Sequence, residues 1–246
     1  LLEVAPPHRR GLYVSIQNAT QYLATLAAGL VGLILASVLS KQGLTDYGWR
    51  IALLLGAAVV PFALAIRRQL PETLHEVRTR PDRATAVGGL LWLGVLGLCM
   101  LASATIGTYT MNYMTTFANR TLGFPPAWAF TATIAVGAAA MTGALLGGII
   151  SDKVWRKPVM IGSSAMLLGL VVPCFTIMVH YHSLPVLLAG TGLMAMFVGM
   201  CAAGAVIALA ESLPVNLRAG SLGIVYALSI ASFGGTAQFI VTWLID

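Results

Sequence analysis

The chain has 246 residues, of which 58% are hydrophobic and 9% are charged, and its mean hydropathy is +0.88. A soluble domain has about 25% charged residues, so this chain lacks the charged shell of a soluble globular protein. Its net charge of +6 does not indicate nucleic-acid binding, because the basic residues lie in short loops between apolar runs. The composition predicts an all-α, polytopic membrane protein.

Seven apolar runs are long enough to be membrane-spanning helices. The second run has about 17 residues and is the shortest of them. Pro126 and Pro185 suit the first turn of the fourth and sixth helices, whereas Pro61 and Pro173 fall inside spans. We expect the helices at residues 12–38, 50–66, 89–117, 126–150, 158–180, 185–211 and 220–245.

The orientation follows from the distribution of Lys and Arg, which favour cytoplasmic loops. One set of loops holds only Lys41, Arg50 and Arg120. The chain is therefore expected to start in the cytoplasm, cross seven times and end outside. The opposite set holds eleven basic residues, namely Arg9, Arg10, Arg67, Arg68, Arg78, Arg80, Arg83, Lys153, Arg156, Lys157 and Arg218.

An internal repeat indicates the architecture. Residues 3–10 and 211–218 both fit E-x-x-P-x-x-x-R, and both lie at a predicted cytoplasmic helix boundary. Six predicted spans separate the copies, and two parallel six-helix repeats are the arrangement of major facilitator transporters. We therefore expect helices five to eleven of twelve, with residues 1–66 closing a first bundle, 67–88 forming the inter-bundle loop, and 89–246 forming the second bundle.

The segment GGIISDKVWRKP at 147–158 resembles the loop signature of major facilitator proteins, G-x-x-x-D-[RK]-x-G-[RK]-[RK]. Trp155 stands where that signature has Gly, so the turn must differ in detail. The matching residues are Gly148, Asp152, Lys153, Arg156 and Lys157.

Further segments resemble the metabolite:proton symporter family, and together they cover essentially the whole chain. They are APPHRRGLYVSIQ at 5–17, YGWRIALLLG at 47–56, LPET at 70–73 and FGGTAQFIVTWLI at 233–245. The resemblance implies proton-coupled symport of a small organic acid by a multi-pass protein of a bacterial-type inner membrane. FGGTAQF is most similar to citrate and tricarballylate carriers.

Other functions stay open at this point. An osmolyte (proline or betaine) or sugar carrier would use the same scaffold. A seven-helix receptor fits the helix count but not the predicted polarity. An enzyme is not expected, since the sequence has no nucleophile–base pair or phosphate loop. We expect no cofactor, metal or nucleic-acid partner; the expected partners are an organic acid, protons and lipid, and a monomer is expected.

The charged motif has a mechanical interpretation. Asp152 and Arg156 are four residues apart and can pair on one helical turn. Asp152 is also expected near the start of the helix at about 220, where a carboxylate is stabilised by free N–H groups. Such a contact would hold the cytoplasmic side of the protein closed. The alternative is a solvated loop whose charges only set the orientation of the chain in the membrane. Glu3 with Arg10, and Glu211 with Arg218, either brace the same gate or cap helices.

Polar residues recur on single faces of three spans, where hydrocarbon would penalise them. Such faces either line a substrate path or hold helices together by hydrogen bonds. The candidates are Tyr109, Asn112, Tyr113 and Thr116 on the third span, Tyr226, Ser229 and Phe233 on the seventh, and Gln17 and Gln21, with Asn18 beside them, on the first.

Two further expectations concern residues inside the spans. Cys99, Cys174 and Cys201 lie within apolar runs and are expected to be small buried residues without disulfides. No Asp, Glu, Lys or Arg lies clearly at mid-membrane in the seven spans. We therefore expect the proton-coupling groups to precede Leu1.

Overall fold

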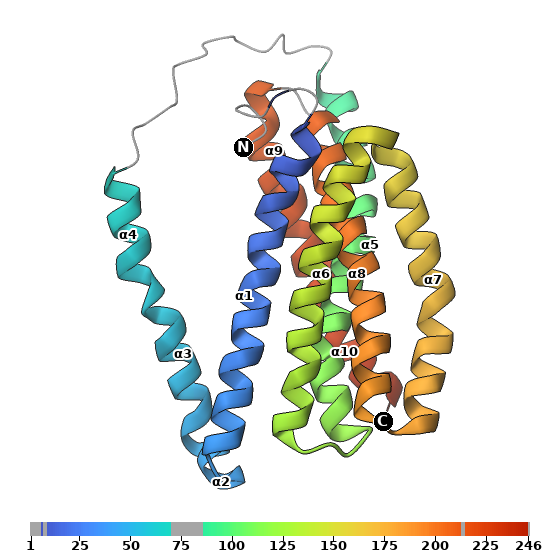
Figure 1. The fold of residues 1–246 in the computed structure, drawn as a ribbon. Helices are drawn as coiled ribbons and strands as arrows, with labels where there is room; N and C mark the ends of the chain where they lie inside the picture. The colour runs from blue at the N-terminus through green and yellow to red at the C-terminus, as the bar shows by residue number, and fades with distance from the viewer. Residues whose placement is uncertain (1–5, 7–8, 70–85, 213–214, 246) are drawn as a thin grey trace.

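The computed structural model describes residue 6 and residues 9–69, 86–212 and 215–245, and Figure 1 shows their arrangement. Every regular element in these ranges is helical. The elements are α1 (Arg10–Val38), α2 (Lys41–Gly43), the π-helical turn η2 (Leu44–Gly48), α3 (Trp49–Ala57), α4 (Val59–Gln69), α5 (Ala86–Arg120), α6 (Pro126–Val154), α7 (Arg156–Tyr181), α8 (Leu184–Ser212), α9 (Val215–Ser229), η3 (Ile230–Gly234, also π-helical) and α10 (Gly235–Ile245).

The seven predicted spans are confirmed. Seven helical stretches of the described chain are long and apolar enough to cross a membrane, each 24 to 29 residues long. α1 begins at one end of the helix bundle and α10 finishes at the other (Figure 1). The chain is therefore an integral, multi-pass membrane protein. The α1 start marks the end that the basic loops predict to be cytoplasmic.

The second span is longer than predicted, and its expected start at residue 50 is wrong. It runs from Lys41 to Arg68. Ser40 caps its first turn by accepting a hydrogen bond from the Gly43 amide at 3.1 Å, and η2 then carries the helix through Asp46. The turn at Ala58 lies three residues before Pro61, where the proline ring prevents regular helical bonding.

α6 and α8 form the centre of the bundle, and α1, α5 and α7 pack around them. Their core is built from small residues and flexible methionines, including Met114, Met178 and Met194. A β-carbon on Gly143 of α6 would clash with the Met196 carbonyl, and one on Gly199 of α8 would clash with the Ala140 carbonyl. Glycine at both positions lets the two backbones touch, as small residues do in membrane bundles.

α3 and α4 stand apart from this core, with exposed side chains throughout residues 51–68. Cys99 is exposed on α5, so the prediction that all three cysteines are buried is wrong for this one. Cys174 and Cys201 are buried as expected. The apolar character of a run does not distinguish a lipid-facing position from a core position, which explains the error.

A sharp turn at Trp155 separates α6 from α7. Its backbone has φ +83° and ψ 160°, a region that only glycine occupies without strain. The major facilitator loop signature has glycine at this position. The turn therefore differs from that signature in its residue, because Trp155 adopts a backbone conformation that suits glycine. The Trp155 side chain is 82% exposed at the predicted cytoplasmic end, where aromatic residues suit the membrane interface.

The close α6–α8 contact predicts that Gly143→Ala destabilises the protein by about 1–3 kcal/mol, because the new methyl group overpacks a backbone contact. Gly169→Ala on α7 is the matched control, since nothing lies within 4 Å of a β-carbon there. Thermal unfolding in detergent should show a lower midpoint for Gly143→Ala only. Equal midpoints would contradict the packing.

The strained turn predicts that Trp155→Gly stabilises the protein by about 1–2 kcal/mol through relief of backbone strain. Trp155→Ala removes the ring but keeps a β-carbon, so it reports the loss of the ring alone. Thermal unfolding of both variants in lipid nanodiscs separates the two effects. The account requires the glycine variant to be the more stable of the pair.

Candidate functional site

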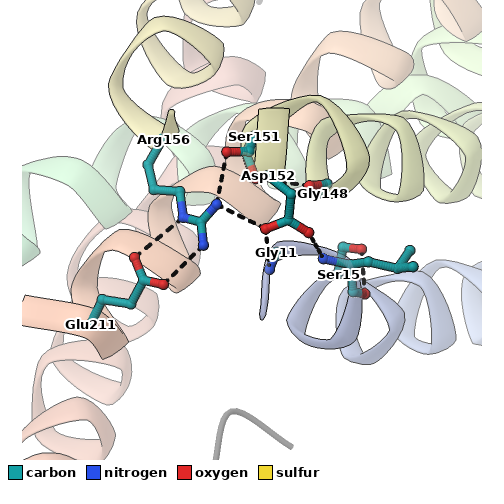
Figure 2. Close-up of polar contacts among 8 residues, drawn as sticks. Gly11, Ser15, Gly148, Ser151, Asp152, Arg156 and Glu211 are labelled. Carbon is teal, nitrogen blue, oxygen red and sulfur yellow. Dashed lines mark hydrogen bonds and ion pairs between the residues drawn. The ribbon is translucent and has the colours of Figure 1, made fainter. Parts of the chain in front are cut away.

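The Asp152 carboxylate caps a helix that is distant in sequence. Its Oδ1 accepts a hydrogen bond from the Gly11 amide at 2.8 Å, and its Oδ2 accepts one from the Leu12 amide at 3.0 Å (Figure 2). These amides belong to the first turn of α1, whose N-cap residue Arg9 makes no side-chain cap. A negative charge there satisfies free N–H groups and complements the helix dipole.

Glycine and serine allow the two backbones to approach at this cap. A β-carbon on Gly11 would lie 2.6 Å from both Asp152 Oδ1 and the Gly148 carbonyl oxygen. A β-carbon on Gly148 would collide with Ser15, which is fully buried. Gly148, the first residue of the loop signature, therefore provides the space in which Asp152 reaches α1.

Arg156 connects this cap to a third helix. Its Nη1 donates to Asp152 Oδ1 at 2.9 Å and to the Ser151 carbonyl at 2.7 Å. Its Nη2 and Nε donate to the two carboxylate oxygens of Glu211, at 2.9 and 3.2 Å. Glu211 lies near the end of α8, so one chain of contacts ties α1, α6, α7 and α8 together (Figure 2).

The charged cluster confirms one sequence prediction and corrects another. Asp152 and Arg156 form the expected i, i+4 ion pair. The helix start that Asp152 caps among the described residues is that of α1, whereas the sequence suggested the helix near residue 220. Sequence places an acidic residue at one end of the bundle, but it does not say which of the helices starting there lies closest.

The remaining charged candidates lie around this cluster or outside the described residues. Lys153, Lys157 and Arg10 have exposed side chains. Glu211 binds Arg156. Glu3 and the side chain of Arg218 lie outside the described part of the chain, so the proposed pairs Glu3–Arg10 and Glu211–Arg218 stay predictions.

A cavity of about 230 Å³ lies between α1, α5, α8 and α9. Three predicted site residues, Gln17, Gln21 and Tyr226, line it together with Asn18. Its other lining residues are apolar or glycine, namely Leu101, Val206, Leu209, Leu222 and Gly223. The fold thus brings polar candidates from the first and seventh spans to one cavity.

Other polar candidates lie between helices. Ser229 is fully buried and shares a hydrogen bond of 3.1 Å with Thr105, which joins α9 to α5. The Tyr109 ring fills the space beside Gly234 in η3. Thr115 on α5 and Thr133 on α6 share a further hydrogen bond. These contacts are ones that hold helices together.

The last candidates are spread over different environments. Tyr113 is buried in the central core, and Asn112 is exposed. Thr116 and Phe233 are half-buried. None of these four belongs to the lining of the 230 Å³ cavity, and their place on a substrate path stays a prediction.

Two buried features of α1 were not predicted from the sequence, which indicated Asn18 only as a neighbour of Gln17 and Gln21. The Asn18 Nδ2 is buried, and no partner for it is found among the described residues. Tyr22, one turn further along α1, is buried in the central core. Ser15, Asn18 and Tyr22 recur at spacings of three and four, so helical periodicity was a usable signal for this buried polar face.

The known proteins that this chain resembles include several named as transporters. A citrate-proton symporter of Klebsiella pneumoniae is 30% identical over 254 residues, covering 100% of this chain and 57% of the symporter. An alpha-ketoglutarate permease of Escherichia coli is 31% identical over 252 residues, covering 97% of this chain and 56% of the permease. An ectoine/proline transporter of Corynebacterium glutamicum is 26% identical, covering 99% of this chain and 53% of the transporter.

The chain therefore spans a little more than half the length of these relatives. No solved structure matches it. The family model described as Major Facilitator Superfamily matches residues 1–228, which include the Asp152 cluster and all the residues that line the cavity. The chain belongs to the Major Facilitator Superfamily.

Proposed function

We propose that the protein is a proton-coupled symporter of a small organic acid, citrate, tricarballylate or a dicarboxylate, that works by alternating access in a bacterial inner membrane. The relatives named citrate-proton symporter and alpha-ketoglutarate permease support this substrate class. An osmolyte carrier is the alternative, supported by the ectoine/proline transporter and by relatives named as putative proline/betaine transporters.

The observation that carries the mechanism is the capping of α1 by Asp152. We assign α1 to α4 to the end of a first six-helix bundle, residues 67–88 to the loop between bundles, and α5 to α10 to the second bundle. With this assignment, the bonds from Gly11 and Leu12 to Asp152 cross from one bundle to the other at the cytoplasmic end.

This contact has a suitable strength for a gate. Hydrogen bonds to a charged group each contribute about 1.5–3 kcal/mol, and Asp152 accepts two from α1. Two conformations that interconvert in a functional cycle differ by a few kcal/mol. The cap therefore holds the closed side but can be broken by the binding energy of substrate and protons.

Arg156 and Glu211 position the gating carboxylate. Arg156 donates to Asp152 Oδ1, the oxygen that also accepts from the Gly11 amide, and it is itself held by the two bonds that it donates to Glu211. Arg156 binds only Oδ1 of Asp152, so Oδ2 accepts from the Leu12 amide of α1 without competition from Arg156. When the bundles rock apart, Asp152 keeps its partner Arg156, which lowers the cost of breaking the cap.

Asp152→Asn, introduced into the protein encoded by the complete reading frame, should lower uptake into proteoliposomes at least about 10-fold. The amide carries no charge for the α1 dipole, and its NH₂ group faces a backbone N–H. Substrate affinity should change less than about 3-fold, since Asp152 does not line the cavity. Asp46→Asn, an exposed carboxylate in η2, is the matched control. Wild-type uptake by Asp152→Asn would reject the gating role.

Uptake assays test the substrate class directly. Proteoliposomes with an inward proton gradient should accumulate citrate, tricarballylate or 2-oxoglutarate, and a protonophore should abolish the accumulation. Uptake of proline or betaine without any of these acids would favour the osmolyte alternative. If none of the five compounds is taken up by folded protein, the proposed function fails.

A further inference from the structure

Three side-chain amides lie within two turns of α1 on the side of the cavity. Gln17, Asn18 and Gln21 all line it, and Tyr226 of α9 contributes a phenol. The rest of the lining is apolar or glycine, and none of its described residues carries a charge. The cavity therefore offers neutral hydrogen-bonding groups beside apolar side chains.

Asn18 is the unusual member of this group. The residue is only 7% exposed, and its Nδ2 has no hydrogen-bond partner among the described residues. A buried donor without a partner costs free energy, and proteins rarely retain one without a reason. Gln17 and Gln21 are exposed, so Asn18 is the buried member of the three amides.

A side-chain amide nitrogen supplies two N–H donors, which require an acceptor. Each N–H could donate to a separate water, but the cavity of about 230 Å³ is several times the ~30 Å³ that one water occupies in the liquid, so it also has room for a larger acceptor. A carboxylate is a stronger acceptor than water, since hydrogen bonds to an ionised group are about twice as strong as neutral ones.

We propose that Asn18, flanked by Gln17 and Gln21, donates hydrogen bonds to one carboxylate group of the transported substrate. The inference rests on the proposed function as a carrier of organic acids. A carboxylate is also the group that citrate and 2-oxoglutarate share with proline and betaine. The amide site thus recognises the carboxylate that these substrates share. Residues outside this site distinguish the rest of each substrate.

Neutral donors suit a site that must bind and release in every cycle. A buried cation would bind the carboxylate more tightly but would be left unpaired and desolvated after release. Amides stabilise the bound anion without that penalty in the empty state. Tyr226 of α9, which also lines the cavity, provides a hydroxyl for a second polar group of the same molecule.

Asn18→Leu separates a ligand-binding amide from a structural one. The substitution removes a buried donor that has no partner in the empty protein, so the melting temperature without ligand should stay equal or rise. Binding of the preferred acid, measured by calorimetry on the purified full-length protein, should weaken about 10- to 100-fold. The probes are citrate, 2-oxoglutarate, proline and betaine.

Asn119→Leu is the matched control with the opposite expectation. The Asn119 Nδ2 donates to the Phe124 carbonyl at 2.8 Å, outside the cavity. This variant should melt at a lower temperature but bind the acid within about 2-fold of wild type. The two asparagines thus test stability and binding in opposite directions.

Each outcome decides the inference. If Asn18→Leu binds as tightly as wild type, or melts lower or fails to fold, then Asn18 is not a substrate donor and the inference is wrong, while the proposed function stands. If folded wild-type protein binds none of the four carboxylates, the proposed function fails and this inference fails with it. Protection of Gln21→Cys from methanethiosulfonate, in a Cys99→Ser background, by whichever of the four probes the wild type binds gives an independent test; equal labelling rates with and without that probe would reject the site.

Discussion

The need to satisfy the free amides at the start of α1 organises one end of this molecule. Helices that start near a membrane surface leave up to four N–H groups without partners, and α1 lacks a side-chain cap of its own. Asp152 provides that cap from 140 residues further along the chain. Gly11, Gly148 and Ser15 then have to be small, because the two helices must nearly touch for a short aspartate side chain to reach.

The same constraint explains the arrangement of charges around the cap. A carboxylate that is only 10% exposed needs a countercharge, and Arg156 supplies it from the beginning of α7. Arg156 in turn needs a second anion to occupy its remaining donors, and Glu211 supplies that from α8. The Asp152 carboxylate that holds α1 is thereby connected, through Arg156 and Glu211, to α8 in the centre of the bundle.

Polar groups inside the spans divide into two kinds. Thr105 and Ser229 satisfy each other in the core and join two helices, which is how membrane proteins accommodate hydroxyl groups. Asn18 is also buried, but its donor has no partner among the described residues, and it lies beside a cavity. The first kind contributes to packing, and the second kind is where a ligand would bind.

Much of this organisation could be predicted from sequence. Apolar length alone gave seven spans, and the i, i+4 spacing gave the Asp152–Arg156 pair. The start of the second span was missed because Lys41 and Asp46 interrupt its apolar run, although helical bonding continues through η2. The partners of Asp152 and Arg156 on α1 and α8 depend on which helices lie side by side. Spacing within one helix carries no information about that.

The central claim is that Asp152 holds α1 against the end of α6 on the cytoplasmic side. Pulsed electron spin resonance can measure this separation directly, with spin labels on the exposed positions Arg9 and Lys153 of the full-length protein. In lipid nanodiscs without substrate, the account predicts one short distance for the wild type and an added longer population for Asp152→Asn. Identical distance distributions in both proteins would contradict it.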